Sequence, residues 1–441
     1  MQPLEKIKLA CSIIRQFKER NLIQISYPFE NSILSNEDDH FLLDIYNEVT
    51  SESYTPSNAY IIDIPKTGGL IRHFSYITIK DQILYILLII DCFPAIFNKI
   101  ARSSPLDSLE VLKNYPRDNS WMKKQIRGDL MEKRKPLFDK GYNCILSSDI
   151  SAFGPNIDIR TLSNELLNAG APESAVEKLE KCLRKWAPLG HKGIPQVYFA
   201  TDLLAEFYLK PVDRYFATFG GCIYLRESDN IEIWCKSQSS CKEMLTNLSR
   251  VLYDRGLYLN NNKTKIVSEK SVDRDEHPME HKKYGWRNDF KLKYNNLMNM
   301  YYRFEQQFLL NECSKRLIKN PEFTIALLQH YATQRININR SLVRFLTSSY
   351  AIYSYQNYTI IKWLIINYRE PDRILLQVVR QFAWNENDPY YLRSIARYFI
   401  YKHGNDTDHD MIETRSREST DSLEKTDMLY LTGVSKDFTI Y

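Results

Sequence analysis

Two aspartates in this chain of 441 residues stand where strands of a sheet could bring them together. Asp149 follows the short apolar run 143–148, and Asp229 lies in the turn of a hairpin that we predict over 222–235. Carboxylates at neighbouring strand ends suit hard cations such as Mg²⁺, and two such cations about 3.5–4 Å apart assist phosphoryl transfer. Turn aspartates that merely end two strands are the alternative, so the surrounding pattern has to distinguish the two interpretations.

The elements around these aspartates alternate between helices and short strands. A Thr-Gly-Gly turn inside 60–74 predicts a first hairpin, and the run 143–148 with the hairpin at 222–235 predicts a small antiparallel sheet. Helical spacing of apolar residues predicts helices within 1–48, 80–100 and 160–186, a long helix ending near 215, and a helix over 239–255. The segment 257–267 closes this unit, and we expect the fold class to be α+β.

The pattern changes after residue 294. Apolar stripes at helical spacing recur six times between 297 and 401, with breaks that include Pro371 and Pro389, and they predict a helical repeat or bundle domain. Residues 403–441 carry nine acids and four bases, a net charge of −5; since the whole chain carries +5, the first 402 residues carry +10. The composition of 405–427 predicts a flexible acidic tail, and the basic body favours a polyanionic partner.

Composition excludes several classes of protein. Hydrophobic residues make up 44% and charged residues 26%, which excludes collagen-like and wholly disordered chains. The longest apolar run, 83–90, ends at Asp91 and is shorter than the roughly 20 residues of a membrane helix, and the charged N-terminus is unlike a signal peptide. Eight cysteines without a Cys-x-x-Cys pair indicate a reducing compartment, so we expect a cytoplasmic protein without a membrane partner.

Five motifs follow one another between about Ile61 and Val267. They are Ile64-Pro-Lys66-x-Gly-Gly-x-Ile-Arg72, Asp149-Ile-Ser-Ala-Phe153 with Ile157-Asp158, Gly193-Ile-Pro-Gln196 with the helix over 203–213, Tyr224-Leu-Arg-Glu-Ser-Asp229-Asn230, and Gly256 to Thr264. In type and order these motifs resemble those of reverse transcriptases, and more closely those of the bacterial defence-associated, abortive-infection branch. This resemblance implies a right-hand polymerase with fingers, a palm with a small antiparallel sheet, and a helical C-terminal domain of HEAT-like repeats.

The resemblance also implies a role for each motif. Asp149 and Asp229 would be catalytic and would bind two Mg²⁺ or Mn²⁺ ions, with the backbone carbonyl of Ile150 as a further ligand. The resemblance further places Lys66, Arg72, Phe153, Gly154 and Gln196 at the incoming nucleotide, and it makes Lys263 an acid that donates to the leaving pyrophosphate. The alternatives are that Lys66, Arg72 and Lys263 are ordinary surface bases and that Gln196 is a simple helix-start residue.

Four positions depart from the usual family pattern. Asn230 replaces the second aspartate of the hairpin pair, and Glu227 stands beside it where an aromatic residue is usual, so both are predicted to lie next to the metals. Val197 replaces a glycine after Gln196, and Gly154 replaces an aromatic residue that usually blocks the sugar 2′-hydroxyl. These changes are compatible with restricted, unusual or template-free polymerisation.

The resemblance therefore implies a metal-dependent DNA polymerase that acts in antiphage defence. Its expected partners are deoxynucleoside triphosphates and nucleic acid, namely a DNA product and a noncoding RNA, together with a second copy or a companion defence protein; a template and a protein primer are both left open. The alternative is a catalytically degenerate subunit that only binds nucleic acid or a scaffold. The predicted domains are 1–140 (N-terminal helices and fingers), 141–270 (palm), 271–402 (helical thumb and repeats) and 403–441 (acidic tail).

Overall fold

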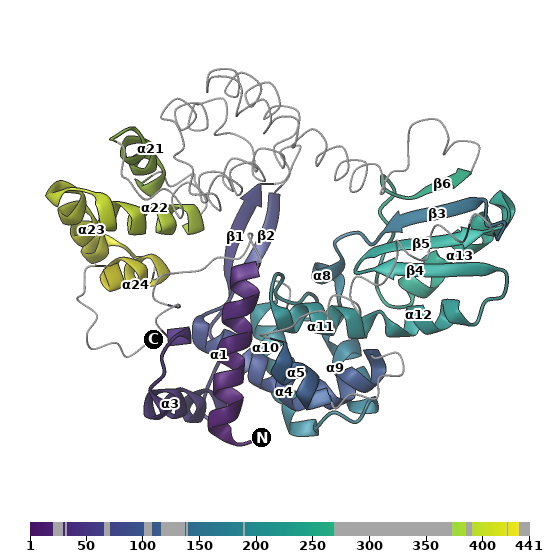
Figure 1. Cartoon of the computed structure of the whole chain (residues 1–441), viewed down its shortest axis with the longest axis horizontal. Helices are drawn as coiled ribbons and strands as arrows, with labels where there is room; N and C mark the ends of the chain where they lie inside the picture. The colour runs from purple at the N-terminus through teal and green to yellow at the C-terminus, as the bar shows by residue number, and fades with distance from the viewer. Residues whose placement is uncertain are drawn as a thin grey trace, which may run out of the picture. The chain divides into compact units, whose positions relative to one another are not determined.

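The computed structural model describes residues 1–20, 30, 33–65, 71–100, 108–115, 137, 140–187, 190–268, 373–384, 390–420 and 422–431 (Figure 1). The chain divides into two compact units. The predicted divisions at residues 140, 270 and 402 stay predictions, and the helical stripes between 297 and 372 lie outside the described residues. The first unit contains Met1–Asn21, Leu34–Ile61 and Phe74–Glu276; the second contains Leu22–Ile33, Ile62–His73 and His277–Tyr441.

Helix α4 (Ile79–Ile100) forms the centre of the helical part of the first unit. By length and composition alone this helix could cross a membrane, but most of its residues are buried against neighbouring helices, as in a core helix. Such burial on all sides explains why its sequence is apolar around its whole circumference. The neighbours are α1 (Pro3–Arg20), α3 (Asp39–Thr50), α5 (Ser108–Asn114), α9 (Ile159–Asn168), α10 (Glu173–Trp186) and α11 (Phe199–Tyr208).

A four-stranded antiparallel sheet with the order β4-β5-β3-β6 forms the other part of the first unit (Figure 1). The central strand β3 is buried along its whole length, and Trp234 of β5 is fully buried beside it. Helix α13 packs against β3, β5 and β6, while α12 packs against β4. The bounds are β3 (Cys144–Asp149), β4 (Cys222–Glu227), β5 (Asn230–Cys235), β6 (Lys265–Ser268), α12 (Lys210–Ala217) and α13 (Gln238–Tyr253).

A separate two-stranded sheet joins β1 (Tyr60–Pro65) to β2 (Ile71–Tyr76). Together with the four-stranded sheet and the helices, it confirms the predicted α+β class. The seven cysteines in the described residues are all free and buried. One further helix of the first unit, α8 (Phe153–Asn156), is a single turn that directly follows the end of β3.

The expectation of a flexible segment over 405–427 is wrong for the described residues. Helices α23 (Asp406–Glu418) and α24 (Ser422–Leu431) fill most of it, and they pack on each other and on α22 (Tyr390–His403). Asn405 and Asp408 form a capping box at the start of α23, and Asp408 also receives two hydrogen bonds from Arg380 in α21 (Arg373–Trp384), at 2.7 and 2.8 Å.

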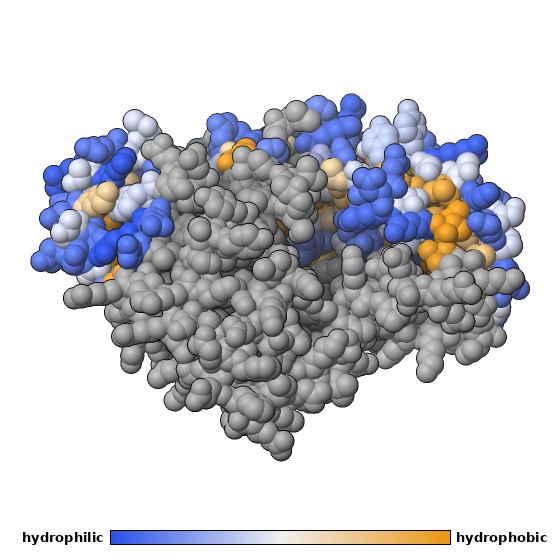
Figure 2. Space-filling view, turned by 90° about the horizontal axis from the view of Figure 1, so that it is seen from above, coloured by the Kyte–Doolittle hydropathy of each residue, from blue (hydrophilic) through white to orange (hydrophobic). Residues whose placement is uncertain are grey.

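Composition misled the prediction because several acids of this segment serve as caps and ion-pair partners rather than repelling one another. Ile412, Met428 and Leu431 turn inward and are buried, so even this polar stretch has an apolar side. The outer side is hydrophilic: Figure 2, seen from above, shows mostly blue residues over these helices, at the left of the view.

Candidate active site at the end of the four-stranded sheet

Asp149 and the turn that carries Asp229 lie side by side at one end of the sheet. Strand β3 pairs with β5 so that Asp149 lies opposite Asn230, the residue that follows Asp229. The backbone N–H of Ile150 donates to the carbonyl oxygen of Asp229 at 3.0 Å, which ties the end of β3 to the turn. The antiparallel register thus brings together two acids that are 80 positions apart in the sequence.

The segment after α13 closes over Asp149 from the other side. The backbone N–H of Asn260 donates to the Asp149 carbonyl oxygen at 2.8 Å, and Ile150 forms a β-bridge with Leu259. The Asp149 side chain is 10% exposed, and its Oδ2 lies 3.1 Å from Lys263 Nζ and 3.4 Å from Asn260 Nδ2. Lys263 is therefore already a cationic partner of the carboxylate that we predicted to bind metal.

The turn between β4 and β5 holds Asp229 in a tight geometry. Glu227 lies opposite Asn230, which leaves Ser228 and Asp229 as a two-residue connection. Ser228 has φ +56°, as the first central residue of a type II′ turn requires. The Asn230 side-chain amide donates to Asp229 Oδ1 at 3.3 Å and to the Glu227 carbonyl oxygen at 3.4 Å. In this arrangement Asn230 positions Asp229, and Glu227 contributes its backbone to the same turn.

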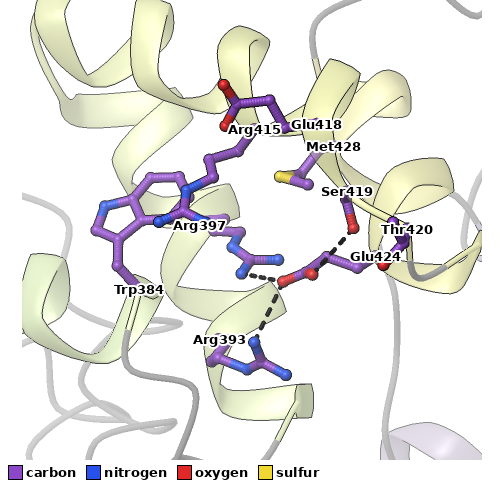
Figure 3. A pocket seen from close by; sticks show the side chains of 9 residues that line it. All are labelled: Trp384, Arg393, Arg397, Arg415, Glu418, Ser419, Thr420, Glu424 and Met428. Atoms are coloured by element: carbon purple, nitrogen blue, oxygen red, sulfur yellow. Dashed lines mark hydrogen bonds and ion pairs between the residues drawn. The ribbon is translucent and has the colours of Figure 1, made fainter.

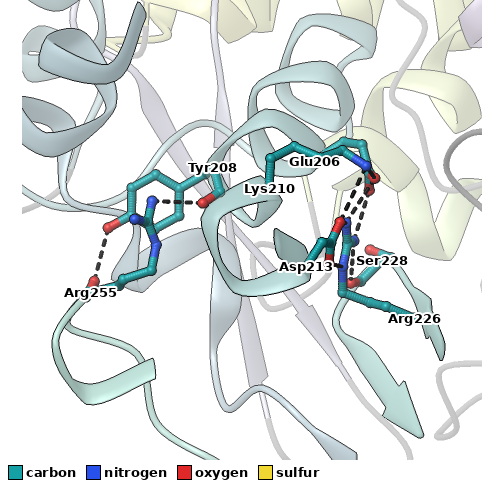
Figure 4. Close-up of polar contacts among 7 residues, drawn as sticks. All are labelled: Glu206, Tyr208, Lys210, Asp213, Arg226, Ser228 and Arg255. Atoms are coloured by element: carbon teal, nitrogen blue, oxygen red, sulfur yellow. Dashed lines mark hydrogen bonds and ion pairs between the residues drawn. The ribbon is translucent and has the colours of Figure 1, made fainter. Parts of the chain in front are cut away.

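A buried charge network that the sequence analysis did not assign anchors this hairpin to the helices (Figure 4). Arg226 of β4 donates two hydrogen bonds to Asp213, each 2.7 Å, and two to Glu206, each 2.8 Å. Its side chain is 4% exposed, and Lys210 lies 3.0 Å from Glu206 and 3.2 Å from Asp213. We name these four residues the Arg226 network.

The Arg226 network balances two cations against two anions, and it stays charged. Burial alone would lower the pKa of Arg226, but Asp213 and Glu206 hold that pKa well above its usual value. Burial alone would likewise raise the pKa of Asp213, yet hydrogen bonds and charge from Arg226 and Lys210 lower it. Arg226 also donates to the Ser228 carbonyl oxygen at 3.0 Å, so the network reaches the turn that carries Asp229.

A signal for this network was present in the sequence. Glu206, Lys210 and Asp213 follow helical i,i+4 and i,i+3 spacing, and Arg226 belongs to the hairpin motif. What the sequence alone did not supply was the pairing between the helical residues and the strand.

A second arginine, Arg255, binds α9 and the C-terminal end of α11. Arg255 donates to both oxygens of Glu165, at 2.7 and 3.0 Å, and to the Tyr208 carbonyl oxygen at 2.6 Å. Its guanidinium also lies over the Tyr208 ring, 4.2 Å from the ring centroid (Figure 4). These contacts connect the segment that follows α13 to α9 and α11.

The loop at 193–197 packs directly on the turn after β3. The N–H of Ile194 donates to the Gly154 carbonyl oxygen at 3.2 Å. A Cβ atom placed on Gly154 would lie 2.8 Å from Gln196 Nε2, so the absence of a side chain at 154 creates the space that Gln196 occupies. Phe153, in contrast, is only 8% exposed and is packed into the core. The structure thus brings Gly154 and Gln196 together.

Val197 adopts a backbone conformation that usually belongs to glycine. Its φ is +65°, in the left-handed region that a β-branched residue very rarely enters. Neighbouring contacts hold this conformation: the hydroxyl of Thr201 donates to the Pro195 carbonyl oxygen, and the Tyr198 hydroxyl accepts from the Ile77 N–H at 3.1 Å. Strain held in place by surrounding structure commonly occurs at functional loops.

The donor set at the end of β3 suits a hard divalent cation. Two carboxylates and nearby backbone carbonyl and amide oxygens are the ligands that Mg²⁺ and Mn²⁺ prefer. Among the residues that the structure describes, no cluster of three or more His, Cys, Asp or Glu side chains that could hold a metal ion is found. The predicted ligand role of Ile150 stays a prediction.

The predicted fingers residues cannot be placed at this site. Lys66 lies outside the described residues, and so does the side chain of Arg72, whose backbone belongs to β2.

Comparisons with known proteins show little. No protein-family model matches the chain, and no curated protein matches it. Among solved structures, the chain is similar to telomerase from Candida albicans in complex with a TWJ fragment of telomeric RNA, with 8% sequence identity and a TM-score of 0.35. The match covers 86% of this chain and 64% of the telomerase chain. At this score the likeness is only weak, and it leaves the family of the chain unassigned.

Proposed function

We propose that this chain is a metal-dependent, reverse-transcriptase-like DNA polymerase that joins deoxynucleoside triphosphates into DNA. One observation carries the proposal: Asp149 and the turn with Asp229 lie side by side at a sheet end, with Lys263 3.1 Å from the Asp149 carboxylate. Paired carboxylates that can hold metal ions, with a cationic lysine that can donate a proton at the same edge, suit nucleotidyl transfer. The order of the five motifs agrees with this arrangement.

Asp149, Asp229 and the carbonyl oxygen of Ile150 would hold two divalent cations. When bound, the cations would neutralise charge on the phosphoryl oxygens and on the pyrophosphate. Asn230 fixes the orientation of the Asp229 carboxylate through its 3.3 Å hydrogen bond. Lys263, whose side chain is 61% exposed, can leave Asp149 and deliver a proton to the pyrophosphate. Lys66 and Arg72 would bind the triphosphate.

The finer parts of the proposal concern the template, the primer and the biological role. Gln196 lies against Gly154, and Val197 has a strained backbone. Because Gly154 and Val197 both depart from the usual family pattern, we propose restricted or template-free synthesis, with a protein hydroxyl as a further option for the primer. Antiphage defence, a cytoplasmic location, and a noncoding RNA, a second copy or a companion protein as partners follow from the sequence resemblance.

A second function is favoured by one specific observation. Asn230 donates its amide to Asp229 and brings no negative charge, whereas the usual pair has two aspartates. A degenerate polymerase that only binds nucleic acid or a scaffold would tolerate this loss. Retention of Asp149 in a buried, hydrogen-bonded position argues for the enzyme.

Incorporation of labelled deoxynucleotides with Mg²⁺ or Mn²⁺ distinguishes the two functions. Asp149→Asn and Asp229→Asn keep the side-chain shape and remove one charge each, so each should abolish incorporation. Asp254→Asn, at an exposed aspartate that ends α13, is the matched control and should retain wild-type activity. Incorporation that survives either of the first two substitutions would contradict the proposed site, and an inactive wild-type chain that still binds nucleic acid would favour the degenerate polymerase.

A further inference from the structure

A charged cavity of about 200 Å³ lies among α21, α22, α23 and α24 in the second unit (Figure 3). Its walls include the ring of Trp384 and three arginines, Arg393, Arg397 and Arg415. Two glutamates also line it, so the wall carries a net charge of +1 when all five groups are ionised. None of these residues belongs to the motifs used in the proposed polymerase function.

Glu424 is the centre of the polar contacts in this cavity. It accepts hydrogen bonds from Arg393 Nη1 at 3.2 Å, from Ser419 Oγ at 3.2 Å and from Arg397 Nη2, as Figure 3 shows. Burial alone would raise the pKa of Glu424, but Arg397 and Arg393 hold that pKa below its usual value. Its negative charge is therefore permanent at neutral pH and is compensated twice.

One of the three guanidinium nitrogens of Arg397 has no hydrogen-bond partner among the described residues. Its side chain is 3% exposed, its Nε donates to the Ala383 carbonyl oxygen at 3.0 Å, and its Nη2 is taken by Glu424. Its Nη1 is buried and has no hydrogen-bond partner among the described residues. The guanidinium also lies 5.2 Å from the centroid of the Trp384 ring. A buried guanidinium N–H without an acceptor is costly, so this group needs an acceptor that enters the cavity.

Arg415 supplies a second positive group at the exposed edge of the same cavity. Glu418, which is also exposed, lines the same edge and would repel an anion. The attraction of an anionic ligand to Arg397 and Arg415 must therefore exceed its repulsion by Glu418. The cavity is smaller than the roughly 300–1,000 Å³ of a typical small-molecule site, so it suits a chemical group rather than a whole nucleotide. Phosphate has several acceptor oxygens and matches guanidinium geometry.

We propose that this cavity binds a terminal phosphate group, presented either by the 5′ end of a nucleic-acid strand or by a free mononucleotide. Arg397 Nη1 would donate to one phosphate oxygen from the inside and Arg415 to another from the rim. The binding does not depend on polymerase activity, so its test and the test of Asp149 and Asp229 can fail separately.

The test compares two single-stranded DNA 12-mers, identical except for a 5′-phosphate and labelled at the 3′ end, by fluorescence anisotropy with the full chain. Since the general attraction of the basic body is common to both, the difference isolates the phosphate. We expect the 5′-phosphate to tighten binding at least threefold. That gain should vanish in Arg415→Gln and in Arg397→Lys. It should remain in Arg417→Gln, the matched control, because Arg417 lies on the same helix, is 75% exposed and pairs with Glu413.

Arg415→Gln changes an exposed side chain, so it decides the question even if Arg397→Lys fails to fold. Competition with AMP identifies the source of the phosphate. If AMP removes the gain as efficiently as an unlabelled 5′-phosphorylated 12-mer does, the ligand is a mononucleotide; if only the 12-mer does, it is a strand end. Equal binding of the two labelled 12-mers, or a gain that persists in Arg415→Gln, would overturn the proposal.

Discussion

Replacing Arg226 by methionine removes one charge from a buried network that has two cations and two anions. The five hydrogen bonds of its guanidinium disappear, and Glu206 and Asp213 then share Lys210 alone. Breaking a buried ion pair by removing one partner costs about 3–5 kcal/mol, and the remaining lysine places this case near about 3 kcal/mol. Since about 1.4 kcal/mol corresponds to a factor of ten, the folded-to-unfolded ratio should fall by about a hundredfold or more.

Urea unfolding at neutral pH, followed by circular dichroism and tryptophan fluorescence, measures this change, because Trp234 is buried in the same sheet. Arg250→Met, at an exposed arginine of α13, is the matched control and should unfold like the wild type. The double variant Arg226→Met with Asp213→Asn restores equal numbers of buried charges, so it should recover a large part of the loss. An Arg226→Met protein as stable as the control, or a double variant less stable than the single one, would refute the reasoning.

Four further outcomes follow from single features. Burial raises the pKa of Asp81 to about 6 from its usual 3.8, so the folded state holds this proton more tightly than the unfolded state does. The free energy of unfolding should therefore fall by about 2 kcal/mol as the pH rises from 4 to 7. Asp81→Asn should flatten this loss, whereas Asp44→Asn, at an exposed aspartate, should keep it. Val197→Gly should raise the melting temperature, because it relieves roughly 1 kcal/mol of strain at φ +65°. Gly154→Tyr must displace Gln196, so the ratio of the incorporation rates of deoxy- and ribonucleotides should change in this variant. An unaltered ratio would show that residue 154 does not contact the nucleotide. Deleting residues 405–431 should expose the core around Ile400 and lower the melting temperature, since α23 and α24 bury Ile412 and Met428.

The sequence predicted the strand that ends at Asp149 and the hairpin that carries Asp229, because strand periodicity and turn residues are local properties. It did not predict that Arg226 would join Glu206 and Asp213, since the contact links elements 13 and 20 positions apart whose faces depend on tertiary packing. The acidic C-terminal segment was misjudged for a related reason. The net charge of a segment does not show which acids have cationic partners, whereas folding depends on individual ion pairs such as that of Asp408 with Arg380.

The order of strands in the four-stranded sheet has a consequence for synthesis of the protein on the ribosome. Strand β3 is central, but its partners β5 and β6 end 86 and 119 residues after Asp149. At about 5–20 residues translated per second, roughly 6–24 s pass before the nascent chain can complete the sheet. Until β5 has been made, the apolar β3 has two unpaired edges, and one edge stays unpaired until β6 follows; other unfinished chains can join these edges. The yield of soluble protein should therefore depend on translation speed and on chaperones that cover this one strand.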